Sequence, residues 1–338
     1  MRKINWLIVF LIVSSYANAQ QDSSAAKKKM MDSVRAVYID EAALKYPRIR
    51  QFSISHEAAG AGDIRSELYG KDFFKGRLRT STTTINLNVP VIESGKNTVV
   101  AGFGVIQQHF SLDEVTSYNV QYAVPKENRD LTTFRTSINY IRRDTLLGLP
   151  ITFNVGVTGL FNSSFSRQRL TYTGLISLPL LRTKNSSLTA GLIVNIDPSS
   201  PVPAFPFLSY SHRFQSLRMD LMVDMPSRIA VRKELNKKAS LSVFGDLAGS
   251  NSFLDINNAT LPQQNIYSSL SIKSGLLFEY RFTKKAVFSF SGGLQSTLTS
   301  KVVEHNETQS NYFIKNNNDM VPYLQVGVSL LPFWKPFR

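Results

Sequence analysis

The stretch LSIKSGLLFEYRF, residues 270–282, decides the fold class because its apolar residues recur at every second position. Even-numbered positions are mostly apolar and odd-numbered positions mostly polar, which places the two kinds of side chain on opposite faces of a β-strand. Strands of soluble proteins average about five or six residues, whereas a tilted strand needs about 9 to 11 residues to cross a bilayer. The alternation lasts through the whole stretch and therefore predicts a membrane-spanning strand.

The same period of two recurs along the chain, at residues 84–89, 134–140, 151–158, 188–196, 240–247 and 288–295. Short polar connections near 93–97, 142–150, 182–186, 215–217, 236–238 and 283–285 alternate with longer ones near 60–77, 111–130, 162–168, 197–204, 249–264 and 300–319, and residues 225–227 fit a tight outer turn. Short turns at one rim and long loops at the other are typical of outer-membrane barrels. We predict an all-β fold, a transmembrane antiparallel up-and-down β-barrel of about 14 strands (about 12 to 16), with short periplasmic turns and longer extracellular loops.

Composition agrees with this class of protein. The 338 residues include no cysteine and 43% hydrophobic residues, which excludes a disordered chain and a disulfide scaffold. Outside the N-terminal 19 residues, no stretch approaches 18 uninterrupted apolar residues, so no helical span is expected.

The N-terminus reads as an export signal. Arg2 and Lys3 precede an apolar run, and Ala17-Asn18-Ala19 forms an A-x-A cleavage site. We expect residues 1–19 to be a cleaved signal peptide, residues 20–47 a periplasmic extension that is partly helical or disordered, and residues 48–338 the barrel. Export without a helical anchor, together with spanning strands, predicts the outer membrane of a Gram-negative cell.

Basic residues outnumber acidic ones, 39 to 24, for a formal charge of +15. The excess concentrates in the short connections, for example at Arg142, Arg143, Lys237, Lys238 and Lys284. This placement predicts contact with outer-membrane lipids through anionic headgroups. The cations are scattered and no recognised binding motif accompanies them, so no nucleic-acid partner is expected.

Charged residues on the polar phase of the strands should face the lumen, and these are the candidate site residues. Two interpretations stay open for them: a water-filled pore that sorts solutes by charge, or a salt-bridged network that closes a narrow barrel. The candidates are Arg135, Asp220, Asp224, Arg228, Arg232, Lys273, Glu279 and Arg281.

The stretch from Asp197 to Pro206 contains four prolines, which stiffen the backbone. It is a candidate constriction loop inside the mouth or a rigid surface cap, and its prolines are Pro198, Pro201, Pro203 and Pro206.

Catalytic signals are weak. The four histidines lack metal-ligand spacing, and no phosphate loop or paired-carboxylate site is visible. Ser209 and His212 suggest a hydrolase built into the barrel wall, but residues so placed in one strand point to opposite faces. We expect no catalytic residues, no metal and no cofactor.

Several motifs resemble an uncharacterised family of bacterial outer-membrane barrels, the domain of unknown function 6268 type. They are Tyr46-Pro47-Arg48-Ile49-Arg50-Gln51, the segment 81–90 ending in Asn88-Val89-Pro90, the loop 201–206, and Met225-Pro226-Ser227-Arg228. The resemblance implies a membrane barrel of unassigned role, with no catalytic residues to carry over. Outer-membrane barrels usually end in an aromatic residue that the barrel-assembly machinery reads, whereas here Phe337 is penultimate and Arg338 is last.

The sequence therefore predicts an integral outer-membrane barrel that acts as a passive pore or transporter for small solutes. A barrel-embedded lipid-modifying enzyme and a structural or adhesive surface barrel are the alternatives. The sequence does not fix the oligomeric state.

Overall fold

The computed structural model describes residues 38–118, 128–197, 203–256 and 261–334, which divide into two compact units, residues 1–49 and 50–338. In the first unit, residues 38–45 are helical and a 3-10 turn, η1, follows at Pro47–Ile49. Proline has no backbone N–H and cannot continue an α-helix, which explains why the helix ends there. None of the described helices is long and apolar enough to cross a bilayer. The expected signal peptide, residues 1–19, lies outside the described residues.

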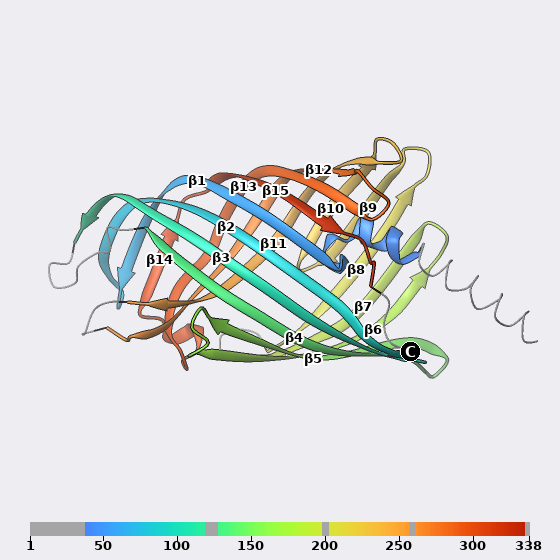
Figure 1. The fold of residues 1–338 in the computed structure, drawn as a ribbon, viewed down its shortest axis with the longest axis horizontal. Coiled ribbons are helices and arrows are strands. Elements are labelled where there is room, and N and C mark those ends of the chain that lie inside the picture. The colour runs from blue at the N-terminus through green and yellow to red at the C-terminus, as the bar shows by residue number, and fades with distance from the viewer. Residues whose placement is uncertain (1–37, 119–127, 198–202, 257–260, 335–338) are drawn as a thin grey trace, which may run out of the picture. The chain divides into compact units, whose positions relative to one another are not determined.

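Antiparallel strands make up the second unit (Figure 1). The first eight are β1 (Phe52–Leu68), β2 (Lys71–Ser94), β3 (Asn97–Ser117), β4 (Arg129–Leu146), β5 (Leu149–Asn162), β6 (Gln168–Arg182), β7 (Ser186–Ile196) and β8 (Ala204–Phe214). The others are β9 (Met219–Met225), β10 (Arg228–Glu234), β11 (Ala239–Asp255), β12 (Gln264–Arg281), β13 (Ala286–Glu304), β14 (Ile314–Asn318) and β15 (Val321–Leu330), with a 3-10 turn η2 at Gln309–Asn311.

The sheet closes on itself, because β1 pairs with β2 on one side and with β14 and β15 on the other, while β13 pairs with β12, β14 and β15. β14 and β15 are two parts of one strand. Ala59 pairs with Tyr323 and Ile64 with Asn318, so the register continues unbroken across the interruption at residues 319–320. Fifteen strand segments therefore form a ring of fourteen strands, which confirms the predicted antiparallel up-and-down barrel and its strand number.

The two rims differ as the sequence predicts. The connections at one end, which we call the turn rim, are at most four residues long: 95–96, 147–148, 183–185, 215–218, 235–238 and 282–285. At the other end, the loop rim, most connections are longer, although β9 and β10 meet directly at residues 226–227. Phe52, the first residue of β1, pairs with Leu330, the last residue of β15, so the barrel's chain begins and ends at the turn rim.

The wall is uneven in height (Figure 1). Eight strands, β1 to β4, β11 to β13 and the combined β14/β15, span 17 residues or more from end to end and form what we call the tall wall. The strands β5 to β10 form the low wall, which is lowest at β9 and β10, each of seven residues. Seven residues rise about 18 Å when tilted by about 40°, less than an apolar band of about 25 Å. This hairpin is therefore shorter than such a band, because the Pro226–Ser227 turn ends it early.

Large apolar side chains on the outward phase remain exposed around the ring. Val243, Leu276 and Leu324 are 58%, 54% and 58% exposed, and Phe103, Ile138, Val155, Ile176 and Phe290 share this orientation. In β12 the even-numbered residues 272, 274, 276 and 280 are exposed, while Ser271 and Glu279 on the opposite phase are buried. The phase predicted from residues 270–282 is confirmed.

One predicted loop is instead a hairpin. Residues 60–77 continue β1 and β2 around a two-residue turn at Tyr69–Gly70. Their apolar side chains pack with those of β13, β14 and the segment before β12 in one cluster near the loop rim, built around Ile64, Leu68, Phe73, Phe74, Leu261, Val302, Phe313 and Ile314. We call this group the apolar cap. It gives these extensions a core of their own, which keeps them ordered as strands.

Candidate functional site

Strand β11 of the tall wall contacts strands on the opposite side of the barrel. β11 lies close to β4 and β5 across the barrel as well as next to its sheet neighbours β10 and β12. Ser252 on β11 donates a hydrogen bond to Gln108 on β3, and Arg129 on β4 donates to the carbonyl of Asp255 at 2.7 Å. These contacts bring opposite sides of the barrel together.

A polar cavity of about 320 Å³ lies within the tall wall. Hydroxyl and amide side chains from β2, β3, β11, β12 and β13 dominate its lining. Arg135, the pair Glu57 and Lys273, and the carboxylates Asp63 and Asp319 bring charge to it. The polar lining residues include Thr80, Thr82, Thr84, Asn86, Gln108, Ser250, Ser269, Ser271, Gln295 and Thr297. Such a lining suits water and small hydrophilic solutes.

Arg135 is held against the inner wall by the sheet register. Gly104 on β3 pairs with Asn86 on β2 and with Arg135 on β4. Because Gly104 has no side chain, the guanidinium passes over it and donates from Nη2 to Oδ1 of Asn86 at 2.5 Å. A β-carbon at position 104 would lie 3.3 Å from Nε of Arg135 and 3.2 Å from that same oxygen.

Lys273 forms an ion pair with Glu57 of β1, and its Nζ lies 5.6 Å from the ring centroid of Tyr323. Glu57 was not among the residues chosen from the sequence. It stands 216 residues before Lys273, and only the closure of the ring brings the two strands onto one cavity. The polar phase of β1 is the signal that could have indicated Glu57.

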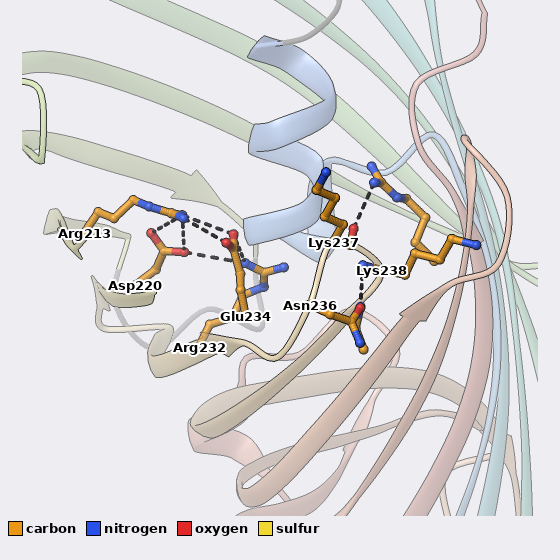
Figure 2. A network of polar contacts seen from close by, with 9 residues as sticks. Arg213, Asp220, Arg232, Glu234, Asn236, Lys237 and Lys238 are labelled. Carbon is orange, nitrogen blue, oxygen red and sulfur yellow. Dashed lines mark hydrogen bonds and ion pairs between the residues drawn. The ribbon is translucent and has the colours of Figure 1, made fainter. Parts of the chain in front are cut away.

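Two other candidates, Asp220 and Arg232, belong to a charged group of the low wall near the turn rim (Figure 2). Asp220 of β9, 2% exposed, lies 3.2 Å from Nη1 of Arg213 and 3.5 Å from Nη1 of Arg232. Glu234 accepts hydrogen bonds from both arginines, at 2.8 and 3.1 Å. Two cations and two anions thus neutralise each other across β8, β9 and β10. Asp220 and Arg232 were expected in the lumen, whereas Arg213 and Glu234 were not.

The remaining candidates are spread along the barrel. Asp224 accepts a hydrogen bond from Ser209 at 2.5 Å, and Arg228 lies 3.5 Å from Asp246. Glu279 is buried and pairs with Arg50 at 2.7 Å. Arg281 lies at the turn rim, where it donates to the carbonyl of Lys237 at 3.0 Å. The eight residues thus form no single site, and only Arg135 and Lys273 line the cavity.

Ser209 and His212, the two residues that suggest a hydrolase, do not interact with each other. Ser209 is bonded to Asp224, whereas Nδ1 of His212 shares a 2.7 Å hydrogen bond with Ser186. Within the described ranges, no three His, Asp or Glu side chains gather as a metal site would require.

The proline-rich stretch is described only in part. Pro198 and Pro201 lie outside the described residues. The carbonyl of Pro203 accepts a hydrogen bond from the backbone of Asn195 at 2.7 Å. Pro206 is part of β8 and pairs with Leu192, so the loop is shorter than the sequence suggested. Proline is tolerated there because β8 has no partner beyond Leu208 on its β9 side.

At the loop rim the start of this stretch is pinned to the wall. Asp197 accepts hydrogen bonds from Arg169 at 2.7 Å and from Thr171 at 2.9 Å, and both members of the ion pair are buried. Arg169 also reaches the carbonyl of His305, whose ring lies 5.8 Å from that of Phe253. Burial, followed by the nearby charges of Arg169 and Arg167, lowers the pKa of His305 below its ordinary 6.5.

Three solved structures are similar to this chain at low identity. An outer membrane channel from Pseudomonas putida F1 is 7% identical, with a TM-score of 0.35, covering 82% of this chain and 94% of that one. The translocator domain of the autotransporter NalP from Neisseria meningitidis is 13% identical, with a TM-score of 0.29 and coverages of 92% and 98%. The Pseudomonas putida toluene transporter TodX is 11% identical, with a TM-score of 0.32 and coverages of 83% and 89%. Likeness at this level carries no functional information.

No curated protein sequence matches the chain. A family model does match residues 151–330, more than half of the chain, from β5 to the last strand. The match includes Met225-Pro226-Ser227-Arg228, one of the motifs that carried the resemblance. The chain therefore belongs to the family described as domain of unknown function DUF6268.

Proposed function

We propose that this protein is an integral outer-membrane barrel that provides a passage for small polar solutes. The observation that carries the proposal is the contrast between the two faces of one closed wall. Outside, side chains such as Val243, Leu276 and Leu324 remain exposed around the ring, and inside, the tall wall encloses a polar cavity. A continuous apolar belt is unfavourable in water, whereas hydrocarbon covers it without cost.

The apolar cap limits what can pass. It packs together the loop-rim ends of β1, β2 and β14 with the end of β13, so the tall wall narrows there. We expect a passage for small solutes with low conductance instead of a wide channel. Hydroxyl and amide groups along the cavity can replace the hydration shell of such solutes.

Export to the outer membrane is part of the proposal. It rests on Ala17-Asn18-Ala19 as the cleavage site, which lies outside the described residues. The turn rim is then the periplasmic one, because the first and the last strand of the barrel begin and end there, at Phe52 and Leu330. Its exposed cations, including Arg142 and Lys96 around Asp144, suit anionic phospholipid headgroups.

Conductance in a planar bilayer tests the passage. Refolded mature chain, checked for a heat-dependent shift in gel mobility, should give small discrete current steps. Folded protein that shifts on heating but gives no steps would reject the passage and leave the barrel intact. A chain whose mobility does not change on heating would reject the membrane barrel itself.

A further inference from the structure

Most of the cationic side chains described inside the barrel are matched by an opposite charge. Lys273 pairs with Glu57, Arg228 with Asp246, and Arg50 with Glu279. The low wall contributes the balanced group of Arg213, Arg232, Asp220 and Glu234. Pairing is expected, because a charge withdrawn from water without a partner is costly.

Arg135 departs from this rule. In the part of the chain that the structure describes, no carboxylate lies within ion-pair distance of its guanidinium, which instead donates to the neutral amide of Asn86. Arg281 likewise has no acidic partner there, but it donates to a carbonyl at the turn rim. Arg135, by contrast, lines the polar cavity.

The Arg135 side chain also has N–H donors left over for a ligand. A guanidinium carries five N–H donors in a planar fork, of which the bond to Asn86 uses one. Gly104 leaves room beneath the guanidinium, and the bond to Asn86 holds one end of the fork in place. Thr84 and Gln108 line the same cavity and bring further donors.

We infer that the cavity binds a small oxyanion, a carboxylate or phosphate group, at Arg135. A planar fork matches two oxygens of such a group, and charge-assisted hydrogen bonds of this kind are stronger than neutral ones. The bound anion supplies the negative charge that no carboxylate of the described residues provides for the Arg135 guanidinium. The acidic side chains of Asp63 and Asp319 also line the cavity. Asp63, however, lies on β1 ten residues beyond Ser53, the residue that pairs with Asn86, so its carboxylate is well away from the contact between Arg135 and Asn86.

The inference deepens the proposed passage by naming the class of solute, yet it can be tested separately. Titration calorimetry on the refolded full mature barrel in detergent, with inorganic phosphate and with acetate as probes, measures binding directly. The Arg135→Gln variant should bind about tenfold to a hundredfold more weakly, as expected for loss of a charge-assisted hydrogen bond. The matched control is Arg281→Gln, which removes a guanidinium that lies outside the cavity and also lacks an acidic partner; it should bind like the unaltered protein.

Each outcome decides the matter. Saturable binding of phosphate alone identifies a phosphate group, and binding of acetate identifies a carboxylate. No saturable binding of either probe, or equal loss in both variants, would overturn the site. Should Arg135→Gln fail to show the heat-dependent mobility shift, Arg135→Lys replaces it: the charge without the fork should bind more weakly than Arg, and unchanged affinity would refute a fork-shaped site. Binding without conductance would reject the passage alone, and conductance without binding would reject the oxyanion site alone.

Discussion

The guanidinium of Arg135 and the side-chain oxygen of Asn86 meet at 2.5 Å across an intervening strand, over a glycine that leaves room for the contact. Replacing Gly104 by Val should force the two apart and lower the free energy of unfolding by about 1–3 kcal/mol, as overpacking does. The control is Gly245→Val, because a β-carbon there meets nothing within 4 Å. Urea unfolding of the two variants in lipid vesicles makes the comparison, and equal stability would contradict this view of Gly104.

Asp220 is the anion on which the network of the low wall depends. Asp220→Asn leaves Arg213 and Arg232 facing Glu234 alone, and breaking a buried pair costs about 3–5 kcal/mol. Asp72→Asn removes the carboxylate of an exposed pair with Arg65 at 3.0 Å, which should cost no more than about 1 kcal/mol. Unfolding midpoints would show the difference, and a loss no larger for Asp220→Asn than for Asp72→Asn would speak against the network.

Arginine on the outer face tests which residues contact lipid. Leu276→Arg should destabilise the folded barrel in vesicles by about 2–4 kcal/mol, the cost of such a change near the bilayer centre. Leu147, 96% exposed in a turn of the turn rim, is the control, and Leu147→Arg should change the unfolding free energy little. A tolerated Leu276→Arg would place that residue outside the apolar band.

Acid should loosen the loop rim around His305. Its pKa is lower in the folded chain than the ordinary 6.5 of the unfolded one, so the unfolded state binds more protons as the pH falls below 6.5. The stability contributed by neutral His305 is thus present above that pH and is lost as the pH falls toward the folded pKa. Hydrogen exchange in residues 303–313, corrected for its intrinsic pH dependence, should quicken between neutral pH and pH 5 and do so less in His305→Gln. Identical pH profiles in the two proteins would refute the role of His305.

The sequence predicts the barrel well because lipid imposes a simple rule on each strand. In β12 the rule holds from end to end, and the turn-rim connections stand out by their polar residues. The rule fails at the loop rim, where Ile64 and Phe74 pack inside the apolar cap. There the pairing of β1 with β2 is also irregular, between residues Ala59 and Gly62 of β1. There the partners are other strands of the protein, which a local pattern does not reveal.

The candidate site was predictable only in part. The phase of β4 places Arg135 on the inner face, and that expectation follows from neighbours in sequence. Its lack of an acidic partner depends on strands far away in the chain, such as β11, which lies close to β4 across the barrel. The pairing of Lys273 with Glu57 likewise required the ring to close. Alternation therefore indicates which way a side chain points, but not what it meets.

Spin labels along β12 give the most direct test of the central claim that hydrocarbon covers the outer face of one closed wall. The chain has no cysteine, so single cysteines at each position from 271 to 280 can be labelled cleanly in the refolded barrel in vesicles. Collision rates with oxygen should rise at 272, 274, 276 and 280 and fall at the positions between, with the polar nickel reagent excluded at the peaks. An absence of this two-residue period, or free access of the nickel reagent to position 276, would contradict the account.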